Sequence, residues 1–228
     1  MTTNVSPRRL VRAEAVLAAR RRRLTLVLED ALDRHNVSAV LRTCEAFGIQ
    51  DVHLVGGDVA SGEINPAVAS GAERWLTLQR HDSAACAIVA LRAQGYRLYV
   101  SHLSPESLPL AALPRDERAA YVFGNEQSGV SQEWLDVADA RFVIPTSGFT
   151  GSLNLSVAAA LVVYDRLLLH RTVAEAPGDL DAAEKAELRA AWYDTLAHGS
   201  AVLERAHRSR LDDPPAPSPV FPVDRHKT

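Results

Sequence analysis

The sequence predicts an α/β domain with a mostly parallel sheet flanked by helices. Short, mostly apolar runs of strand length alternate with segments of helical periodicity between residues 24 and 170. Strands that alternate with helices in this way are joined by crossover connections, which make the strands parallel. Polar, glycine-bearing loops follow several of the apolar runs, and ligands of open α/β sheets bind beyond the carboxyl ends of the strands.

The first element is an arginine-rich arm. Residues 6–23 have helical character but few large apolar side chains, so the arm either docks on another surface or stays mobile. Residues 24–28 form an apolar run that predicts a buried strand. We expect a helix from Asn36, a good N-cap residue, to Gly48, and a second strand at residues 51–55.

The same alternation continues to residue 170. Further strands are predicted at residues 75–78, 97–103, 121–123 and 142–144, and further helices at residues 82–94, from residue 131 and at residues 153–170. One more amphipathic helix is predicted within residues 179–207, and the tail has five prolines in eleven residues, which predicts disorder. The expected organisation is an arm (1–23), a domain (24–170), a helical extension (171–211) and a tail (212–228).

Charge is distributed unevenly along the chain. The 228 residues carry a formal net charge of −3. Residues 1–23 contain seven Arg and one Glu, a net of +6, whereas the remaining 205 residues carry 18 basic and 27 acidic groups, a net of −9. A basic arm on an acidic body permits a nucleic-acid partner that the average charge conceals.

The bulk composition argues against several classes of protein. The sequence contains no run of 18 apolar residues, so no membrane span is predicted. The first residues also lack the apolar segment of a signal peptide. Cys44 and Cys86 have no CxxC spacing, so neither a zinc site nor a disulfide framework is predicted. We therefore expect two reduced, buried thiols in a cytoplasmic protein. Walker and GxGxxG loops are also missing from the sequence.

Three polar clusters follow predicted strands, at residues 36–42, 124–129 and 146–154. In the first cluster, Asn36 is either a plain helix cap or a site residue. Arg42 lies off the apolar stripe of its helix. It is either a surface arginine paired with Glu45 or a group that meets a ligand.

The other two clusters carry glycines beside polar side chains. Glu126 lies between two glycines, in a tight turn or in a loop whose backbone approaches a ligand. Ser152 can cap the helix that follows it, which would place Asn154 in the first turn near unpaired N–H groups. Asn154 either belongs to a capping network or faces a ligand.

Together the clusters resemble the three motifs of the SpoU/TrmH family of RNA ribose 2′-O-methyltransferases. The segments are Asn36-Val-Ser-Ala-Val-Leu-Arg42-Thr-Cys-Glu-Ala-Phe-Gly48, Phe123-Gly-Asn-Glu126-Gln-Ser-Gly129-Val-Ser and Ile144-Pro-Thr-Ser-Gly-Phe-Thr-Gly-Ser152-Leu-Asn154-Leu-Ser-Val-Ala-Ala. The resemblance covers residues 24–170. It implies a methyltransferase domain with a C-terminal deep trefoil knot, a homodimer with the site at its interface, S-adenosyl-L-methionine as cofactor, and no metal.

The resemblance also implies roles for individual residues. Arg42 would be the catalytic arginine, either as general base or as a phosphate clamp, supported by Asn36, Glu126, Ser152 and Asn154. The backbone near four residues would hold the cofactor, namely Ser101, Gly124, Ile144 and Leu153. Six arginines of the arm and of the end of the long helix are expected to contact RNA, namely Arg8, Arg9, Arg12, Arg20, Arg166 and Arg171.

The substrate implied by the resemblance is the D-loop guanosine at position 18 of tRNA. Methylation of ribosomal RNA or of another tRNA position is the first alternative, and a catalytically silent RNA-binding protein is the second. Two features depart from the family pattern. Residues 149–151 read Phe-Thr-Gly where members commonly have Met-Val-Gln, and the end of the long helix, residues 166–171, has few arginines.

Overall fold

The computed structural model describes residues 7–31, 33–56, 71–115, 118–167 and 178–197. Contacts divide the chain into two units, which are described separately. The larger unit comprises residues 22–175, and the smaller combines residues 1–21 with residues 176–228. The predicted tail, residues 212–228, lies outside the described residues.

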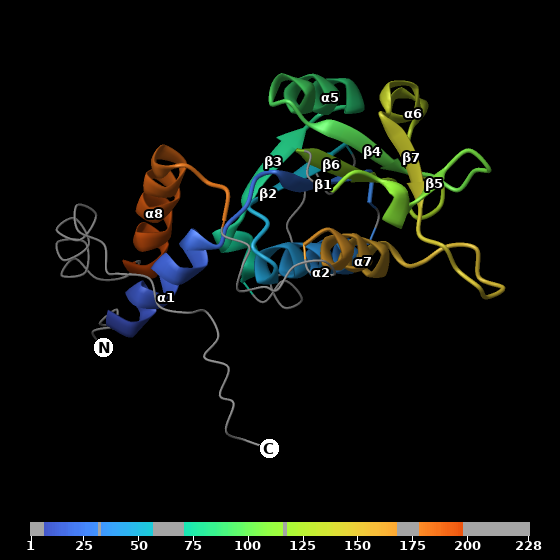
Figure 1. Cartoon of the computed structure of the whole chain (residues 1–228). Coiled ribbons are helices and arrows are strands. Elements are labelled where there is room, and N and C mark those ends of the chain that lie inside the picture. The colour runs from blue at the N-terminus through green and yellow to red at the C-terminus, as the bar shows by residue number, and fades with distance from the viewer. Residues whose placement is uncertain (1–6, 32, 57–70, 116–117, 168–177, 198–228) are drawn as a thin grey trace, which may run out of the picture. The chain divides into compact units, whose positions relative to one another are not determined.

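A parallel sheet forms the centre of the larger unit (Figure 1). Its strands are β1 (Leu24–Glu29), β2 (Asp51–Val55), β3 (Thr77–His81), β4 (Arg97–Ser101), β5 (Leu108–Pro109), β6 (Ala119–Phe123) and β7 (Ala140–Val143). They are ordered β3-β2-β1-β6-β4-β7-β5, and every pairing is parallel. The predicted parallel sheet is confirmed. The trefoil knot stays a prediction.

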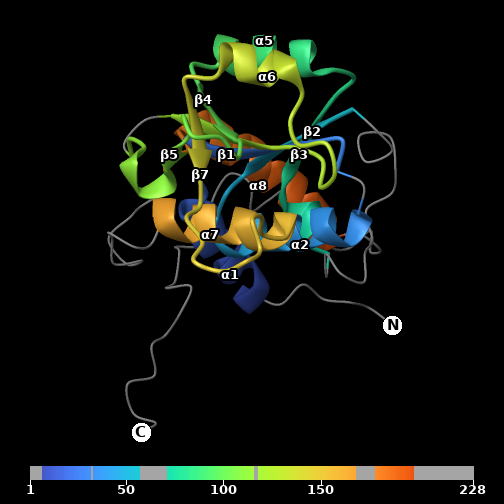
Figure 2. The same ribbon diagram turned by 90° about the vertical axis from the view of Figure 1, so that its right-hand side faces the viewer.

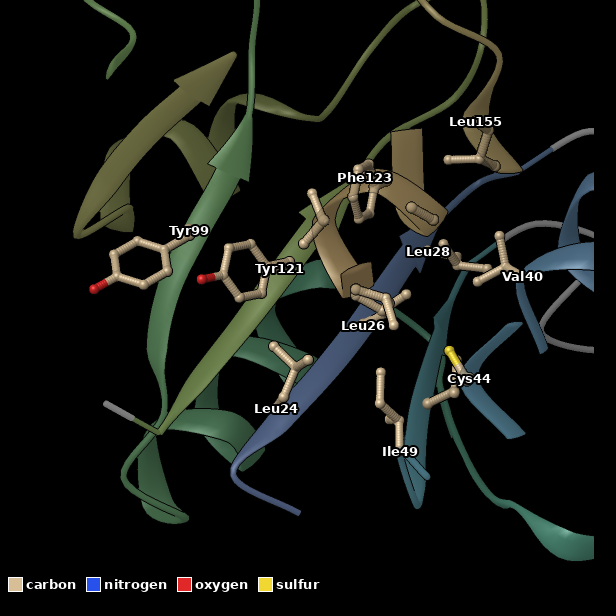
Figure 3. Packing of buried hydrophobic residues seen from close by; sticks show 14 of the residues in the cluster. Leu24, Leu26, Leu28, Val40, Cys44, Ile49, Tyr99, Tyr121, Phe123 and Leu155 are labelled. Carbon is tan, nitrogen blue, oxygen red and sulfur yellow. The ribbon is translucent and has the colours of Figure 1, made fainter. Parts of the chain in front are cut away.

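Helices cover both faces of this sheet, as predicted. The helices α2 (Arg34–Ala46) and α7 (Leu155–Leu167) lie side by side on one face, and α5 (Ala84–Ala93) and α6 (Gln132–Val137) lie on the other (Figures 1 and 2). The side chains of β1 alternate between two cores: Leu26 packs towards α2 and α7, and Val27 towards α5 and α6. Figure 3 shows Leu26 and its neighbours on β1 beside Val40 and Cys44 of α2.

Two helix starts differ from the prediction. Asp33 caps α2, since its carboxylate accepts a hydrogen bond from the backbone N–H of His35 at 2.8 Å. Asn36 therefore lies inside the first turn, and its amide is available for another contact. At α7 the helix begins at Leu155 and the capping side chain is Asn154 rather than Ser152. The cap of α2 thus lies three residues before the predicted Asn36, and the cap of α7 lies two residues after the predicted Ser152.

Smaller differences concern the sheet edges and the cysteines. Residues 75–78 were predicted as a strand, but a 3₁₀ turn (Ala72–Trp75) precedes β3. The two-residue strand β5 was not predicted, because its Pro109 argues against a strand. Proline is tolerated there because β5 lies at the edge of the sheet. Cys44 is buried as expected, whereas Cys86 is exposed on α5. No helix in the described ranges is both long enough and apolar enough to cross a membrane.

The smaller unit is built on two helices, α1 (Pro7–Ala18) and α8 (Ala182–Ala197). The buried Glu14 carboxylate accepts hydrogen bonds from Nε and Nη2 of Arg189 and from the Tyr193 hydroxyl, all at 2.8 Å. The hydrogen bond that Arg189 donates to Glu14 raises the pKa of Arg189. The arm was expected either to dock on another surface or to stay mobile. Docking is observed, because the buried Glu14 carboxylate of α1 is hydrogen-bonded to two residues of α8.

Candidate active site

A chain of hydrogen bonds joins one side chain from each of the three polar clusters. Asn36 lies in the first turn of α2, Glu126 in the loop after β6, and Asn154 directly before α7. Nδ2 of Asn36 donates to Oε1 of Glu126 at 3.0 Å, and Nδ2 of Asn154 donates to Oδ1 of Asn36 at 3.0 Å. These contacts connect positions 90 and 118 residues apart in the sequence. All three side chains are exposed or half-buried, so a ligand can reach them.

The helix cap sets the direction of this chain. Oδ1 of Asn154 accepts from the Ser156 backbone N–H at 2.9 Å, the Ser156 hydroxyl at 2.7 Å and the Val157 N–H at 3.4 Å. Because Oδ1 serves the helix, the NH₂ group of Asn154 faces Asn36, whose own NH₂ group then faces Glu126. The Glu126 carboxylate is therefore the acceptor at the end of the chain. The two roles considered for Asn154, capping and facing a site, are combined in one side chain.

The loop that carries Glu126 is closed by its own residues. Oδ1 of Asn125 accepts from the N–H groups of Gln127 at 2.8 Å and Ser128 at 3.2 Å, and Asn125 forms two backbone hydrogen bonds with Gly129. A Cβ atom on Gly124 would lie 2.2 Å from the carbonyl carbon of Gly129. Gly124 thus permits the close approach of its own loop. Asn125 is not among the site residues predicted from the sequence. An asparagine four residues before a glycine is nevertheless a pattern that indicates a tight turn.

Arg42 and Ser152 are not part of the hydrogen-bonded chain. Arg42 is exposed on α2, and no acidic side chain among the described residues forms an ion pair with it. The alternative pairing with Glu45 is therefore not observed. Ser152 is exposed in the loop before α7. The geometry brings three of the five expected catalytic residues together and leaves Arg42 and Ser152 with their side chains accessible.

The four positions expected to hold the cofactor follow neighbouring strands. Ser101 ends β4, Gly124 follows β6 and Ile144 follows β7, and these three strands are adjacent in the sheet. Leu153 precedes α7 in a loop without any charged residue from position 144 to position 155. Backbone at the carboxyl ends of adjacent strands is where open α/β sheets bind ligands, and the three strand-end residues are partly exposed.

The arginines expected to contact RNA fall into different environments. Arg8, Arg9 and Arg12 are exposed on α1. Arg20 is fully buried, and its guanidinium lies 5.0 Å from the centroid of the Trp192 ring. Burial against an aromatic ring speaks against RNA contact by Arg20 and indicates a packing role. Arg171 lies outside the described residues.

Arg166 is also withdrawn from the surface. Its side chain is 3% exposed and forms an ion pair with Asp165. Its guanidinium donates to the carbonyls of Leu110 at 2.6 Å, Leu113 at 3.0 Å and Pro114 at 3.3 Å. These bonds hold the end of α7 to the segment before β6, so they indicate a structural role for Arg166 rather than an RNA contact. A sequence cannot distinguish such an arginine from an exposed one.

A buried histidine on β2, His53, pairs with the partly buried His81 of β3. Nδ1 of His53 lies 2.9 Å from Nε2 of His81, and the rings are stacked with centroids 5.1 Å apart. Burial, with His81 as a second cause, lowers the pKa of His53 to about 4. Burial also lowers the pKa of His81, against the opposing effect of Asp82. The pair is therefore neutral at pH 7. No cluster of three metal-binding side chains occurs among the residues that the structure describes.

Known proteins share both the sequence pattern and this fold. The SpoU rRNA Methylase family model matches residues 23–164. The chain belongs to this family. A relative in Borreliella burgdorferi, named tRNA (guanosine(18)-2′-O)-methyltransferase, is 37% identical over 200 residues, which cover 88% of this chain and 91% of the relative. The resemblance inferred from the three motifs is thereby confirmed.

Solved structures of SpoU-like proteins agree with the fold. The crystal structure of the A. aeolicus TrmH/SpoU tRNA modifying enzyme matches with a TM-score of 0.70 and 25% identity, covering 89% of this chain and 95% of that one. The AdoMet-bound rRNA methyltransferase from Sinorhizobium meliloti matches with a TM-score of 0.59 and 22% identity, over 71% of this chain and 61% of that one. The second likeness concerns the fold alone.

Proposed function

We propose that this protein is an S-adenosylmethionine-dependent methyltransferase that modifies the ribose 2′-oxygen of guanosine 18 in tRNA. The observation that carries the proposal is the hydrogen-bonded chain from Asn154 through Asn36 to Glu126, which unites the three motifs of a SpoU family member. The name of the Borreliella burgdorferi relative, and the high coverage of both chains, support guanosine 18 as the target.

The proposed reaction needs a positioned ribose and a route for one proton. S-Adenosylmethionine, when bound, would supply an electrophilic methyl group and would leave as S-adenosylhomocysteine when its methyl–sulfur bond breaks. The ribose 2′-oxygen would form the new C–O bond, and its proton would pass to a base. Ser101, Gly124, Ile144 and Leu153 would hold the cofactor through their backbones. Glu126, oriented by Asn36, would fix the neighbouring backbone and ribose hydroxyls.

Arg42 acts in this proposal by binding a phosphate. An arginine stays protonated in proteins, so it is a poor base but a good bidentate donor. Its exposure on α2, without an acidic partner among the described residues, leaves the guanidinium available for an RNA phosphate. A phosphate oxygen held in this way can take the proton from the 2′-hydroxyl. Arg8, Arg9 and Arg12 on α1 would add contacts to the RNA backbone.

We further propose that two copies associate through α7. The side chains of Leu153, Val157, Leu161 and Tyr164 are 37%, 47%, 41% and 48% exposed. The spacing of four and three residues places Val157, Leu161 and Tyr164 on one side of α7, and Leu153 lies in the loop directly before the helix. An apolar stripe beside the candidate site suits a second copy of the chain. Because the proposed substrate is tRNA, we also propose that the protein acts in the cytoplasm.

The test is to incubate the protein with labelled S-adenosylmethionine and total RNA and to map the methylated nucleotide. The expected product is 2′-O-methylguanosine at position 18 of tRNA. If the label appears in ribosomal RNA or at another tRNA position, the proposed target is wrong but the proposed 2′-O-methyl transfer stands. Absence of transfer despite cofactor binding would favour a silent RNA-binding protein. Arg42→Ala is expected to lose activity, whereas Arg74→Ala, at another exposed arginine of the larger unit, should retain it.

A further inference from the structure

We infer that Glu29 is a positioning residue, which holds the Glu126 loop in the shape that the proposed methyl transfer requires. This inference rests on the proposed function of that loop. Glu29 is the last residue of β1 and is only 5% exposed. No basic side chain among the described residues forms an ion pair with it. A buried carboxylate without a cation is unfavourable unless several donors compensate it.

Three donors from one short segment provide that compensation. Oε2 of Glu29 accepts from the Ser131 backbone N–H at 2.7 Å. Oε1 accepts from the Ser131 hydroxyl at 2.7 Å and from the Trp134 indole N–H at 3.0 Å. Ser131 is the N-cap position of α6 and directly follows the loop that contains Glu126. The carboxylate therefore fixes the carboxyl end of that loop to the end of β1.

The residue after Glu29 fixes the other end of the loop. The carbonyl oxygen of Asp30 accepts a hydrogen bond from Nδ2 of Asn125 at 2.9 Å. Asp30 has a φ of +45°, the one positive value among described residues other than glycine. Such a conformation is uncommon outside glycine, although aspartate adopts it more readily than most residues. Its N–H bonds to the Val55 carbonyl at 2.9 Å, which leaves its carbonyl turned towards the loop.

Glu29 and Asp30 thus form a clasp around the loop, with Asn125 at one end and Ser131 at the other. Glu126 lies between these two attachment points and contacts Asn36, which follows Asp30 by six residues in the chain. The same two residues consequently set the loop relative to the first turn of α2. A loop held at one end alone would lose order, and both the cofactor-binding backbone and Glu126 would be displaced.

The sharpest perturbation is Glu29→Gln, which preserves size and removes one acceptor. If the amide NH₂ replaces Oε1 it faces the Trp134 N–H, and if it replaces Oε2 it faces the Ser131 N–H. Either orientation sets a donor against a donor, since neither N–H can rotate away. Ser131→Ala is a milder variant, because it removes the hydroxyl and keeps the backbone bond. Leu24→Ala is the control, since Leu24 is buried at the amino end of the same strand and belongs to a core cluster that contains none of residues 125–131.

Two measurements on the full chain test the inference. We expect Glu29→Gln to accelerate hydrogen exchange at residues 125–131 at least tenfold and to weaken S-adenosylhomocysteine binding, measured by calorimetry, about tenfold. Ser131→Ala should show smaller changes in the same direction. Leu24→Ala should lower the melting temperature while leaving local exchange and affinity near the wild-type values.

Two results would overturn the inference. One is wild-type exchange at residues 125–131 in Glu29→Gln. The other is a loss of cofactor affinity in Leu24→Ala that is as large, relative to its loss of stability, as the loss in Glu29→Gln. Glu29 would then be purely structural. The exchange measurement needs no ligand, so it tests Glu29 even if the wild-type chain binds no cofactor. That last outcome would refute the proposed function instead.

Discussion

Replacing Asn154 by Asp separates the two tasks that this side chain performs. The Oδ1 atom caps α7, and the Nδ2 atom bonds to Asn36. In Asn154→Ala both contacts are lost, at about 1 kcal/mol for the cap and about 1 kcal/mol for the hydrogen bond. A loss of about 2 kcal/mol corresponds to a melting temperature lowered by roughly 4–8 °C in a protein of this size.

Asn154→Asp keeps an acceptor for the helix N–H groups. Its negative charge at the amino end of α7 contributes about 0.3–1 kcal/mol, which offsets most of the lost hydrogen bond to Asn36. We therefore expect a melting temperature near the wild-type value. The carboxylate nevertheless faces Oδ1 of Asn36, so the Asn36 amide turns and no longer donates to Glu126. Methyl transfer to tRNA should fall at least tenfold.

Thermal unfolding and single-turnover methyl transfer, measured on all three proteins, test this reasoning. If Asn154→Asp is as unstable as Asn154→Ala, the capping argument is wrong. If Asn154→Asp transfers methyl groups at the wild-type rate, the hydrogen-bonded chain has no part in catalysis. Asn154→Ser, which can also cap the helix but cannot reach Asn36 with an NH₂ group, should behave like the aspartate variant.

Further predictions concern the loop, the buried histidine and the arginines. Gly124→Ala forces a Cβ to within 2.2 Å of the Gly129 backbone, so we expect calorimetry to show at least a tenfold loss of cofactor affinity. Folded His53 has a pKa of about 4 against 6.5 in the unfolded chain, so the unfolded state takes up the proton first and stability falls as the pH drops from 6.5 towards 4. The loss is at most about 3 kcal/mol, and urea unfolding of His53→Gln should show a flatter pH dependence. Arg166→Met leaves buried carbonyls unpaired and should lower the free energy of unfolding by about 3 kcal/mol without changing the salt dependence of RNA binding. Arg12→Ala should leave the stability unchanged. It should reduce the slope of the logarithm of RNA affinity against the logarithm of salt concentration by about one unit. An unchanged slope would remove Arg12 from the RNA interface.

The strands and the location of the site could be predicted from the sequence for a simple reason. Buried parallel strands are short apolar runs, and their carboxyl ends meet along one edge of the sheet. The sequence therefore predicts that Glu126 and Asn154 lie near Asn36. The order of the strands could not be predicted, because periodicity gives the faces of a strand and says nothing about its neighbours.

Other features depend on contacts between residues distant in the sequence. Asp33 and Asn36 are both good caps, and only the packed structure decides between them. Arg166 looks like a surface arginine at the end of a helix until its carbonyl partners, more than fifty residues away, are known. The Glu29 clasp spans 102 residues, and no local pattern marks a carboxylate that is bonded in this way.

The most direct test of the central claim uses two tRNA transcripts that differ in one atom. One has guanosine at position 18, and the other has 2′-deoxyguanosine there, with every other ribose intact. We predict that labelled S-adenosylmethionine gives one methyl group per molecule of the first transcript and none on the second. Equal incorporation into both transcripts would contradict the account, because the acceptor would then be another atom.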